Sequence, residues 1–240
     1  MTLPAVRDPT QRSGHRWVTA GCRSGVEAGR YDPASVVSSD IAAFDVDGTL
    51  TRRDCVLPFL VRVAGRRSVA RALARRPHLL VAAARDRNRR DDVKVLLTGV
   101  LAGRDEADVQ AKGQDFATEI ADHWMRPDVV ERLRWHADAG HDVVLVTASL
   151  AAYAEPLGAR LGATRVVATE LEADGAGRLT GRLSGANCRG EEKVRRLAAV
   201  YGDPPHLAWA YGDSPDDAPM LRLARHPVHV GPEPLVAVPS

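Results

Sequence analysis

The chain has 240 residues, with 33 Lys and Arg against 31 Asp and Glu, a net charge of +2, and 45% hydrophobic residues. This composition is typical of a soluble globular protein, and it excludes collagen-like, disordered and disulfide-scaffold classes. The length suits one large domain or one domain that carries a sizeable insertion.

Membrane and secretory signals are weak in this sequence. The longest uninterrupted apolar run, residues 79–84, is far shorter than the roughly 20 residues that a transmembrane helix needs. The arginines near the N-terminus are not followed by the apolar segment of a secretory signal. Cys22, Cys55 and Cys188 are widely separated and show no CxxC spacing, which favours reduced thiols over disulfides or a zinc site. We therefore expect a cytoplasmic protein.

The first half of the chain divides into three parts. Residues 1–39 are rich in Arg, Gly, Ser and Pro without an apolar period, which predicts a flexible N-terminal tail. Residues 41–44 (IAAF) predict a short buried strand that ends at Asp45. In residues 54–123 the apolar residues recur at spacings of three or four, so we predict helices there and no strand.

From Pro127 onwards, predicted helices and strands alternate. The helices are expected from Pro127 to Gly140 and over residues 150–161, 190–201 and 215–224; the strands are expected over residues 142–147, 165–170, 178–183, 206–211 and 227–230. A glycine-containing turn at residues 174–177 predicts that the second and third of these strands form a hairpin. The alternation predicts an α/β fold with a doubly wound parallel sheet, whose sites lie at the C-terminal strand ends.

Two predicted strands end in clusters of acids, DVDGT at residues 45–49 and GDSPDD at residues 212–217. A lone Asp-Gly pair is ordinarily a turn, and an Asp before a helix is ordinarily an N-cap. In a parallel sheet, however, both strand ends face one crevice, and carboxylates gathered there need a cation such as Mg²⁺. The pairing of the two clusters therefore indicates a magnesium-dependent phosphate site.

Four segments resemble, in order, the motifs of the haloacid dehalogenase (HAD) superfamily. They are FDVDGTL at residues 44–50, LVTAS at 145–149, Lys193 within CRGEEK, and YGDSPDDAPML at 211–221. Residues 168–197 further resemble the phosphoserine-phosphatase-like subfamily, usually called IB. The resemblance covers about residues 40–234. It implies a HAD-like Rossmannoid core of residues 40–53 and 124–240, with an all-helical cap of residues 54–123 inserted after the first strand.

The resemblance implies a phosphatase that acts on a small phosphorylated metabolite. Asp45 would be the nucleophile that forms an aspartyl-phosphate, and Asp47 the general acid and base. Thr147 would donate its hydroxyl to a phosphoryl oxygen, and Lys193 would neutralise Asp45 and the transferred group.

The same resemblance places Mg²⁺ and the substrate. Asp45, the main-chain carbonyl of Asp47 and Asp213 would hold the ion, with Asp217 as a further ligand or directly behind the ligands. The implied substrate contacts are Gly48, Ala148, Asp54 and Asp216.

Three departures bear on the substrate. Asp54 stands where phosphoserine phosphatases commonly have Glu, Thr147-Ala148-Ser149 replaces their SGG, and Asp216 replaces an Asn. An amino acid phosphate is therefore not favoured. Phosphoserine phosphatase proper and a phosphatase of a lipid head group stay open as alternatives. So does a phosphoryl-accepting signalling module, which would lack the acid and base role of Asp47.

Residues 61–90 hold ten Arg and one Asp, a local charge of +9 that leaves −7 for the other residues. This segment fits a solvated helix face, a surface that steers anionic substrates, or a module that contacts an anionic membrane surface. It contains no interleaved aromatic residues, so no nucleic-acid partner is expected. The oligomeric state is left open.

Overall fold

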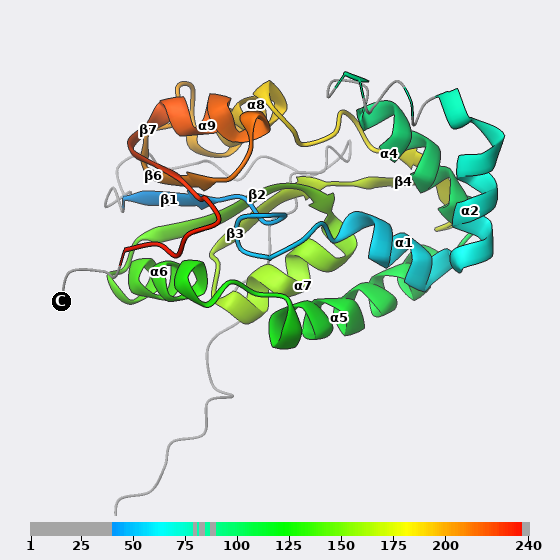
Figure 1. Ribbon diagram of the computed structural model, residues 1–240, viewed down its shortest axis with the longest axis horizontal. Helices are drawn as coiled ribbons and strands as arrows, with labels where there is room; N and C mark the ends of the chain where they lie inside the picture. Colours follow the sequence, from blue (N-terminus) through cyan, green and yellow to red (C-terminus); the bar gives the residue numbers. More distant parts are fainter. Residues whose placement is uncertain (1–39, 79–80, 82–84, 87–89, 237–240) are drawn as a thin grey trace, which may run out of the picture.

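The computed structural model describes residues 40–78, 81, 85–86 and 90–236, so the predicted tail at 1–39 lies outside the described residues. Figure 1 shows a central sheet with helices above and below it, and a further group of helices beyond one end of the strands. In chain order the elements are β1 (Ile41–Phe44), α1 (Val56–Ala64), α2 (Arg66–Arg75), α4 (Arg90–Thr98), η2 (Gly99–Leu101), α5 (Glu106–His123), α6 (Pro127–Asp138), β2 (Asp142–Leu150), α7 (Ala151–Leu161), β3 (Arg165–Thr169), β4 (Leu171–Ala173), β5 (Leu179–Leu183), α8 (Glu191–Tyr201), β6 (Leu207–Gly212), η3 (Pro215–Asp217), α9 (Ala218–Leu223) and β7 (Ala224–His229).

The main sheet has five strands in the order β3-β2-β1-β6-β7, and every neighbouring pair is parallel. The short first strand lies at the centre, with β2 and β6 on its two sides. The predicted α/β fold with a doubly wound parallel sheet is therefore confirmed. Because all the strands run the same way, their carboxyl ends meet at one edge of the sheet.

Side chains on the two faces of the sheet belong to two separate clusters of buried residues. Along β1, Ala42 and Phe44 belong to the cluster that also contains Leu157 of α7, whereas Ala43 belongs to the cluster with Leu197 of α8. This alternation is the period of two expected of a strand that is buried on both faces. Helices α8 and α9 thus cover one face, and α6 and α7 cover the other (Figure 1).

The described part of residues 54–123 is helical and contains no strand, as the apolar spacing predicts. Helix α5 begins after Asp105, whose carboxylate accepts the N–H groups of Ala107 and Asp108 at 3.0 and 3.3 Å, a regular N-cap. Helices α1, α2 and α4 lie beyond the carboxyl ends of the strands (Figure 1). The boundaries of tail, core and cap stay predictions.

The predicted hairpin is wrong in its first strand. Residues 165–170 do not form one strand of it: β3 pairs with β2 in the main sheet, and the separate strand β4 pairs with β5. A run of strand-forming residues shows no sign of where the chain leaves one sheet for another, because both pieces have the same local pattern. Other bounds also shift. Strand β2 extends to Leu150, the helix predicted over 215–224 is η3 followed by α9, and the strand predicted over 227–230 is β7, which already begins at Ala224.

Within the described residues, no helix is both long enough and apolar enough to span a membrane.

Candidate active site

The two acid clusters meet at the carboxyl edge of the sheet. Asp45 follows β1 directly, and Asp213 follows β6. Gly48 brings the first cluster against the second: its φ is +89°, and a Cβ built there would lie 2.5 Å from Oδ2 of Asp213. Thr49 then donates its hydroxyl to Oδ1 of Asp213 at 3.2 Å. The DxDGT turn therefore needs glycine for both its conformation and its close approach.

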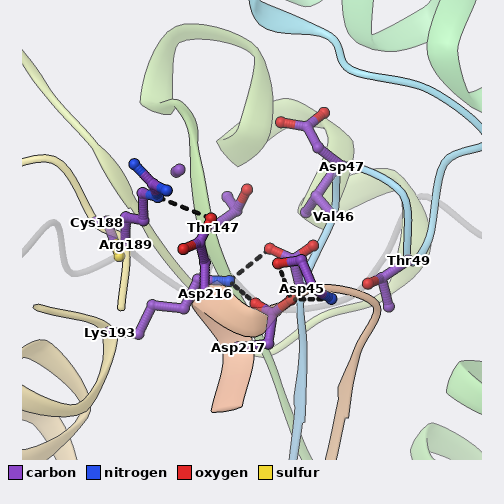
Figure 2. A network of polar contacts seen from close by, with 12 residues as sticks. Asp45, Val46, Asp47, Thr49, Thr147, Cys188, Arg189, Lys193, Asp216 and Asp217 are labelled. Atoms are coloured by element: carbon purple, nitrogen blue, oxygen red, sulfur yellow. Dashed lines mark hydrogen bonds and ion pairs between the residues drawn. The ribbon is translucent and has the colours of Figure 1, made fainter. Parts of the chain in front are cut away.

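Lys193 joins the first cluster to the second. Its Nζ donates to Oδ1 of Asp45 and to Oδ1 of Asp217, each at 2.6 Å (Figure 2). Ser214 donates from its N–H and its hydroxyl to the other oxygen of Asp217 at 3.0 and 2.8 Å. The exposed fractions are 6% for Asp45, 2% for Lys193 and 1% for Asp217. This is a buried ion-pair network with nearly every donor satisfied.

Burial dominates the electrostatics of this group. It raises the pKa of Asp45 to about 7; the charge of Asp217 adds to the shift, and Lys193 opposes it. Burial alone would lower the pKa of Lys193, but Asp45 and Asp217 raise it above its usual value, so the ammonium stays charged. Burial and the nearby Asp217 also raise the pKa of Asp213. Burial therefore makes the ionised form of these carboxyl groups costly, and the neighbouring Asp217 adds to that cost, more than Lys193 offsets.

The donor set of this group fits a hard divalent cation. Asp45, Asp213 and Asp217 each offer a carboxylate oxygen, and the three oxygens lie within 4.8 Å of one another. Oxygen ligands of this kind are the ones that Mg²⁺ prefers. Three carboxylates with one ammonium leave two negative charges uncompensated, which a divalent cation would balance.

Asp47 belongs to a second network beside the first. Its Oδ1 accepts the N–H of Cys55 at 2.9 Å, and its Oδ2 accepts the hydroxyl of Ser149 at 2.6 Å. Figure 2 shows its carboxylate apart from the group of Asp45, Lys193 and Asp217. Burial, helped by the charge of Asp54, raises the pKa of Asp47 to about 6, while the two hydrogen bonds lower it. A carboxyl group with this pKa can both give and take a proton near neutral pH.

Both networks border one pocket of about 440 Å³. The residues that line it are Asp45, Asp47, Gly48, Asp54, Val56, Leu57, Val93, Lys94, Leu97, Ala148, Asn187, Arg189, Lys193, Asp213, Ser214, Asp216 and Asp217. Of the ten residues predicted from the sequence, nine thus line this pocket. Thr147 does not: it is 0% exposed, and its hydroxyl accepts the N–H of Ser149 at 3.0 Å.

Two of the predicted substrate contacts already have partners. Asp54 caps α1, because its Oδ1 accepts the N–H groups of Val56 and Leu57 at 3.0 and 3.3 Å. Asp216 forms an ion pair with Nε of Arg189 at 2.8 Å, visible in Figure 2. The negative charge that Asp216 brings to the pocket is therefore matched by a guanidinium.

Sequence reasoning assigned no role to Lys94, Ser149 or Arg189. Lys94 of α4 donates to the carbonyl of Ala148, and to Oδ1 of Asn187 at 2.5 Å. A lone lysine on a predicted helix carries no signal of such contacts. Ser149 and Arg189, in contrast, lie inside the motif segments LVTAS and CRGEEK, so their positions beside Thr147 and Lys193 could have indicated them.

Comparisons with known proteins agree with this geometry. The haloacid dehalogenase-like hydrolase family model matches residues 42–222. Protein CicA of Caulobacter vibrioides is 38% identical over 184 residues, which cover 77% of this chain and 82% of that protein. A probable phosphatase of Mycobacterium tuberculosis is 31% identical over 200 residues, 80% of this chain and 69% of that protein.

Solved structures share the fold. A Bordetella pertussis protein of unknown function has a TM-score of 0.69 at 26% identity, and the match covers 82% of this chain and 92% of that one. Phosphoserine phosphatase, solved as a phospho-aspartyl intermediate analogue, has a TM-score of 0.52 at 17% identity, with 78% and 83% covered. With the family match and the curated relatives, the chain belongs to the haloacid dehalogenase-like hydrolases, and it is a phosphatase-type member of that family.

Proposed function

We propose that the chain is a magnesium-dependent phosphomonoester hydrolase that acts through an aspartyl-phosphate on Asp45. The observation that carries the proposal is the arrangement of Asp45, Asp213, Asp217 and Lys193 at one strand edge, beside a separately held Asp47. A carboxylate oxygen of Asp45 would attack phosphorus while the bond to the leaving oxygen breaks and its electron pair goes to that oxygen. Water would then hydrolyse the aspartyl-phosphate.

Asp47 would serve both halves of this reaction. It would give its proton to the leaving oxygen in the first step and take a proton from the attacking water in the second. Its position at the pocket wall and its pKa of about 6 support this role. Because it lies outside the ion-pair network of Lys193, its proton can move without breaking the hydrogen bond from Lys193 to Asp45.

Lys193 would keep Asp45 ionised and offset the charge of the transferred phosphoryl group. The hydrogen bond of 2.6 Å from Lys193 to Oδ1 of Asp45, which lowers the pKa of that carboxyl against the effect of burial, supports the first part of this role. Thr147 would orient the phosphoryl group together with main-chain N–H groups near Gly48 and Ala148, which border the pocket. Because the Thr147 hydroxyl is buried, its contact with a phosphoryl oxygen would need a small adjustment of the last residues of β2.

Asp45, Asp213 and Asp217, with the main-chain carbonyl of Asp47, would hold Mg²⁺. When bound, the ion supplies positive charge that lets an anionic nucleophile and an anionic phosphate approach each other. The raised carboxyl pKa values of Asp45 and Asp213 support a cation in this place.

The pocket volume of about 440 Å³ supports a small phosphorylated metabolite as substrate. Its walls combine apolar residues of α1 and α4, such as Leu57 and Val93, with the charges of Asp54 and Arg189. Phosphoserine and the phosphate of a lipid head group are the substrates that a metabolite panel should include beside sugar and alcohol phosphates.

A chromogenic aryl phosphate tests the proposal directly. We expect turnover with Mg²⁺, loss of turnover with a chelator, and recovery when Mg²⁺ is added back. Asp45→Asn should remove turnover while circular dichroism shows an intact fold. Mass spectrometry after acid quenching should find a phosphoryl group on the wild-type peptide that contains Asp45.

Undiminished turnover by Asp45→Asn would contradict the proposal. A phosphoryl group that accumulates on Asp45 with no multiple turnover would instead identify a phosphoryl-accepting module. Asp47→Asn should lose catalysis yet keep most of its affinity for Mg²⁺, because asparagine retains the main-chain carbonyl.

A further inference from the structure

A chain of buried hydroxyl groups leads from the interior of the protein to Asp47. The hydroxyl of Tyr153 donates to Oγ of Ser149 at 2.9 Å, and that hydroxyl donates to Oδ2 of Asp47 at 2.6 Å. Ser149 and Tyr153 are both 0% exposed. The carboxylate that faces the pocket is therefore held from the protein interior.

Aromatic packing holds Tyr153, the residue at the interior end of these linked hydroxyl groups. The Tyr153 ring lies 4.9 Å from the Phe59 ring and 5.4 Å from the Phe116 ring, in tilted and edge-on contacts between centroids. Burial and the charge of Asp47 raise the pKa of Tyr153 well above its usual value. The hydroxyl therefore keeps its proton. Because the Ser149 hydroxyl gives its one hydrogen to Asp47, it accepts from Tyr153, and donation runs from Tyr153 through Ser149 to Asp47.

Ser149 also links Asp47 to Thr147. Its N–H donates to the Thr147 hydroxyl at 3.0 Å while its own hydroxyl donates to Asp47. The N–H of Cys55 reaches the other oxygen of Asp47 at 2.9 Å. Two donors, one on each oxygen, leave the carboxyl group a single orientation. Each oxygen keeps a further lone pair that can carry the proton to be transferred.

We propose that Ser149, oriented by Tyr153, is a positioning residue that holds Asp47 where it can protonate the leaving group. The inference rests on the proposed function, in which Asp47 gives its proton to the leaving oxygen as the phosphorus–oxygen bond breaks. Misplacing an acid by a fraction of an ångström lowers its effectiveness strongly, because proton transfer needs hydrogen-bond contact.

Two aryl phosphates that differ in their leaving group provide the test. Dinitrophenolate leaves without much help from an acid, whereas phenolate needs a proton. For Ser149→Ala we expect kcat/KM to fall about 10-fold to 100-fold with phenyl phosphate and less than about 3-fold with 2,4-dinitrophenyl phosphate. Tyr153→Phe should change the two values in the same direction by smaller factors. Ser149→Thr, which keeps a hydroxyl, should restore most of the phenyl phosphate activity.

Tyr211→Phe is the matched control. It also removes a buried hydroxyl, in this case one that lies 2.9 Å from Nε2 of His136, with no contact to Asp47. We expect a loss of stability similar to that of Tyr153→Phe and no difference between the two esters.

An equal loss of kcat/KM with both esters in Ser149→Ala, or a gain, would overturn the positioning role. Asp47→Asn separates this failure from that of the proposed function. If Asp47→Asn loses far more activity with phenyl phosphate than with the dinitrophenyl ester and Ser149→Ala does not, only the positioning role fails. If Asp47→Asn itself makes no distinction, the acid role of Asp47 fails as well.

Discussion

Gly48 connects the backbone conformation of the first acid cluster with the position of Asp213. Any side chain at this residue meets both an unfavourable φ of +89° and the Asp213 carboxylate at 2.5 Å. We expect Gly48→Ala to destabilise the protein by roughly 1–3 kcal/mol and to displace Asp213. Chemical denaturation should show the first effect. The second should appear as a higher Mg²⁺ concentration for half-maximal activity.

Gly140 offers a control for the effect of backbone strain without any steric contact. Its φ is +78°, and a Cβ there would meet nothing within 4 Å. Gly140→Ala should therefore lose stability through backbone strain while its Mg²⁺ dependence stays that of the wild type. If both variants shift the Mg²⁺ dependence equally, the close approach of Gly48 to Asp213 is not what shapes the site.

At the scale of elements, Lys94 fastens α4 to the sheet. Its ammonium donates to the carbonyl of Ala148, to Oδ1 of Asn187 at 2.5 Å and to the hydroxyl of Thr169 at 3.4 Å. Ala148 lies near the end of β2, Thr169 ends β3, and Asn187 precedes α8. Removing the ammonium should therefore free α4 from the core. In Lys94→Met we expect faster amide hydrogen exchange in Arg90–Thr98 and a KM raised several-fold.

Lys112→Met is the corresponding control on α5. Among the residues that the structure describes, Lys112 pairs only with Asp108, one helical turn away on the exposed side of α5. Its loss should leave both the exchange of α4 and the KM unchanged. Unaltered exchange of α4 in Lys94→Met would mean that apolar packing, rather than this lysine, holds the helix in place.

Helix α6 is joined to the sheet through a buried histidine. His136 is 0% exposed; its Nε2 lies 2.9 Å from the Tyr211 hydroxyl and its Nδ1 2.8 Å from Nδ1 of His141. Burial, with added repulsion from His141 and Arg132, lowers its pKa from 6.5 to about 3. Between these pH values the unfolded chain binds a proton at His136 that the folded chain does not, so this residue makes stability fall as the pH falls.

We therefore expect the unfolding free energy to depend on pH through His136. Its contribution should be complete above about pH 7 and decrease by up to about 1.4 kcal/mol per pH unit below about pH 6. His136→Gln, which does not titrate, should remove this dependence relative to the wild type. Chemical denaturation of both proteins at neutral and mildly acidic pH measures the difference. Parallel pH profiles would show that the histidine is not buried in its neutral form.

At the scale of the whole molecule, the positive charge of α2 faces outward. Arg66, Arg67, Arg71, Arg75 and Arg76 are all exposed. Arg67, Arg71 and Arg75 are spaced by four residues and form one row along the helix. If this row steers anionic substrates, kcat/KM for a multiply charged phosphate should fall with salt as the Debye length shrinks from about 30 to 10 Å.

The triple change of Arg67, Arg71 and Arg75 to Gln should flatten this salt dependence and leave kcat nearly unchanged. Initial-rate assays across a range of ionic strength measure kcat and the salt dependence of kcat/KM. A triple variant with the wild-type salt slope and wild-type binding to anionic vesicles would show that the row is only a solvated helix face. Residues 87–89, which add to the basic segment, lie outside the described residues.

The positions of the acids at the strand ends could be predicted from the sequence, because a local pattern of residues identifies them. An apolar strand that stops at consecutive acids and glycine leaves Asp45 and Asp213 few places other than the carboxyl edge of a parallel sheet. Lys193 and Asp217 follow from their motif order. The hydrogen bond from Ser149 to Asp47 and the hydrogen bonds from Lys94 to Ala148 and Asn187 could not be predicted. Each depends on how closely two segments approach that are distant in sequence and share no local pattern.

The central place of β1 has a consequence for the growing polypeptide on the ribosome. Both neighbours of this strand come much later in the chain, beginning at Asp142 and Leu207. Lys193 lies 148 residues from the Asp45 that it contacts, and Asp213 lies 164 residues from Thr49. A nascent chain therefore leaves one edge of the apolar strand β1 unpaired until β6 has emerged, and no fragment that ends before Asp217 holds the complete set of carboxylates. Such long-range closure makes folding slow and leaves early translation products open to chaperone binding.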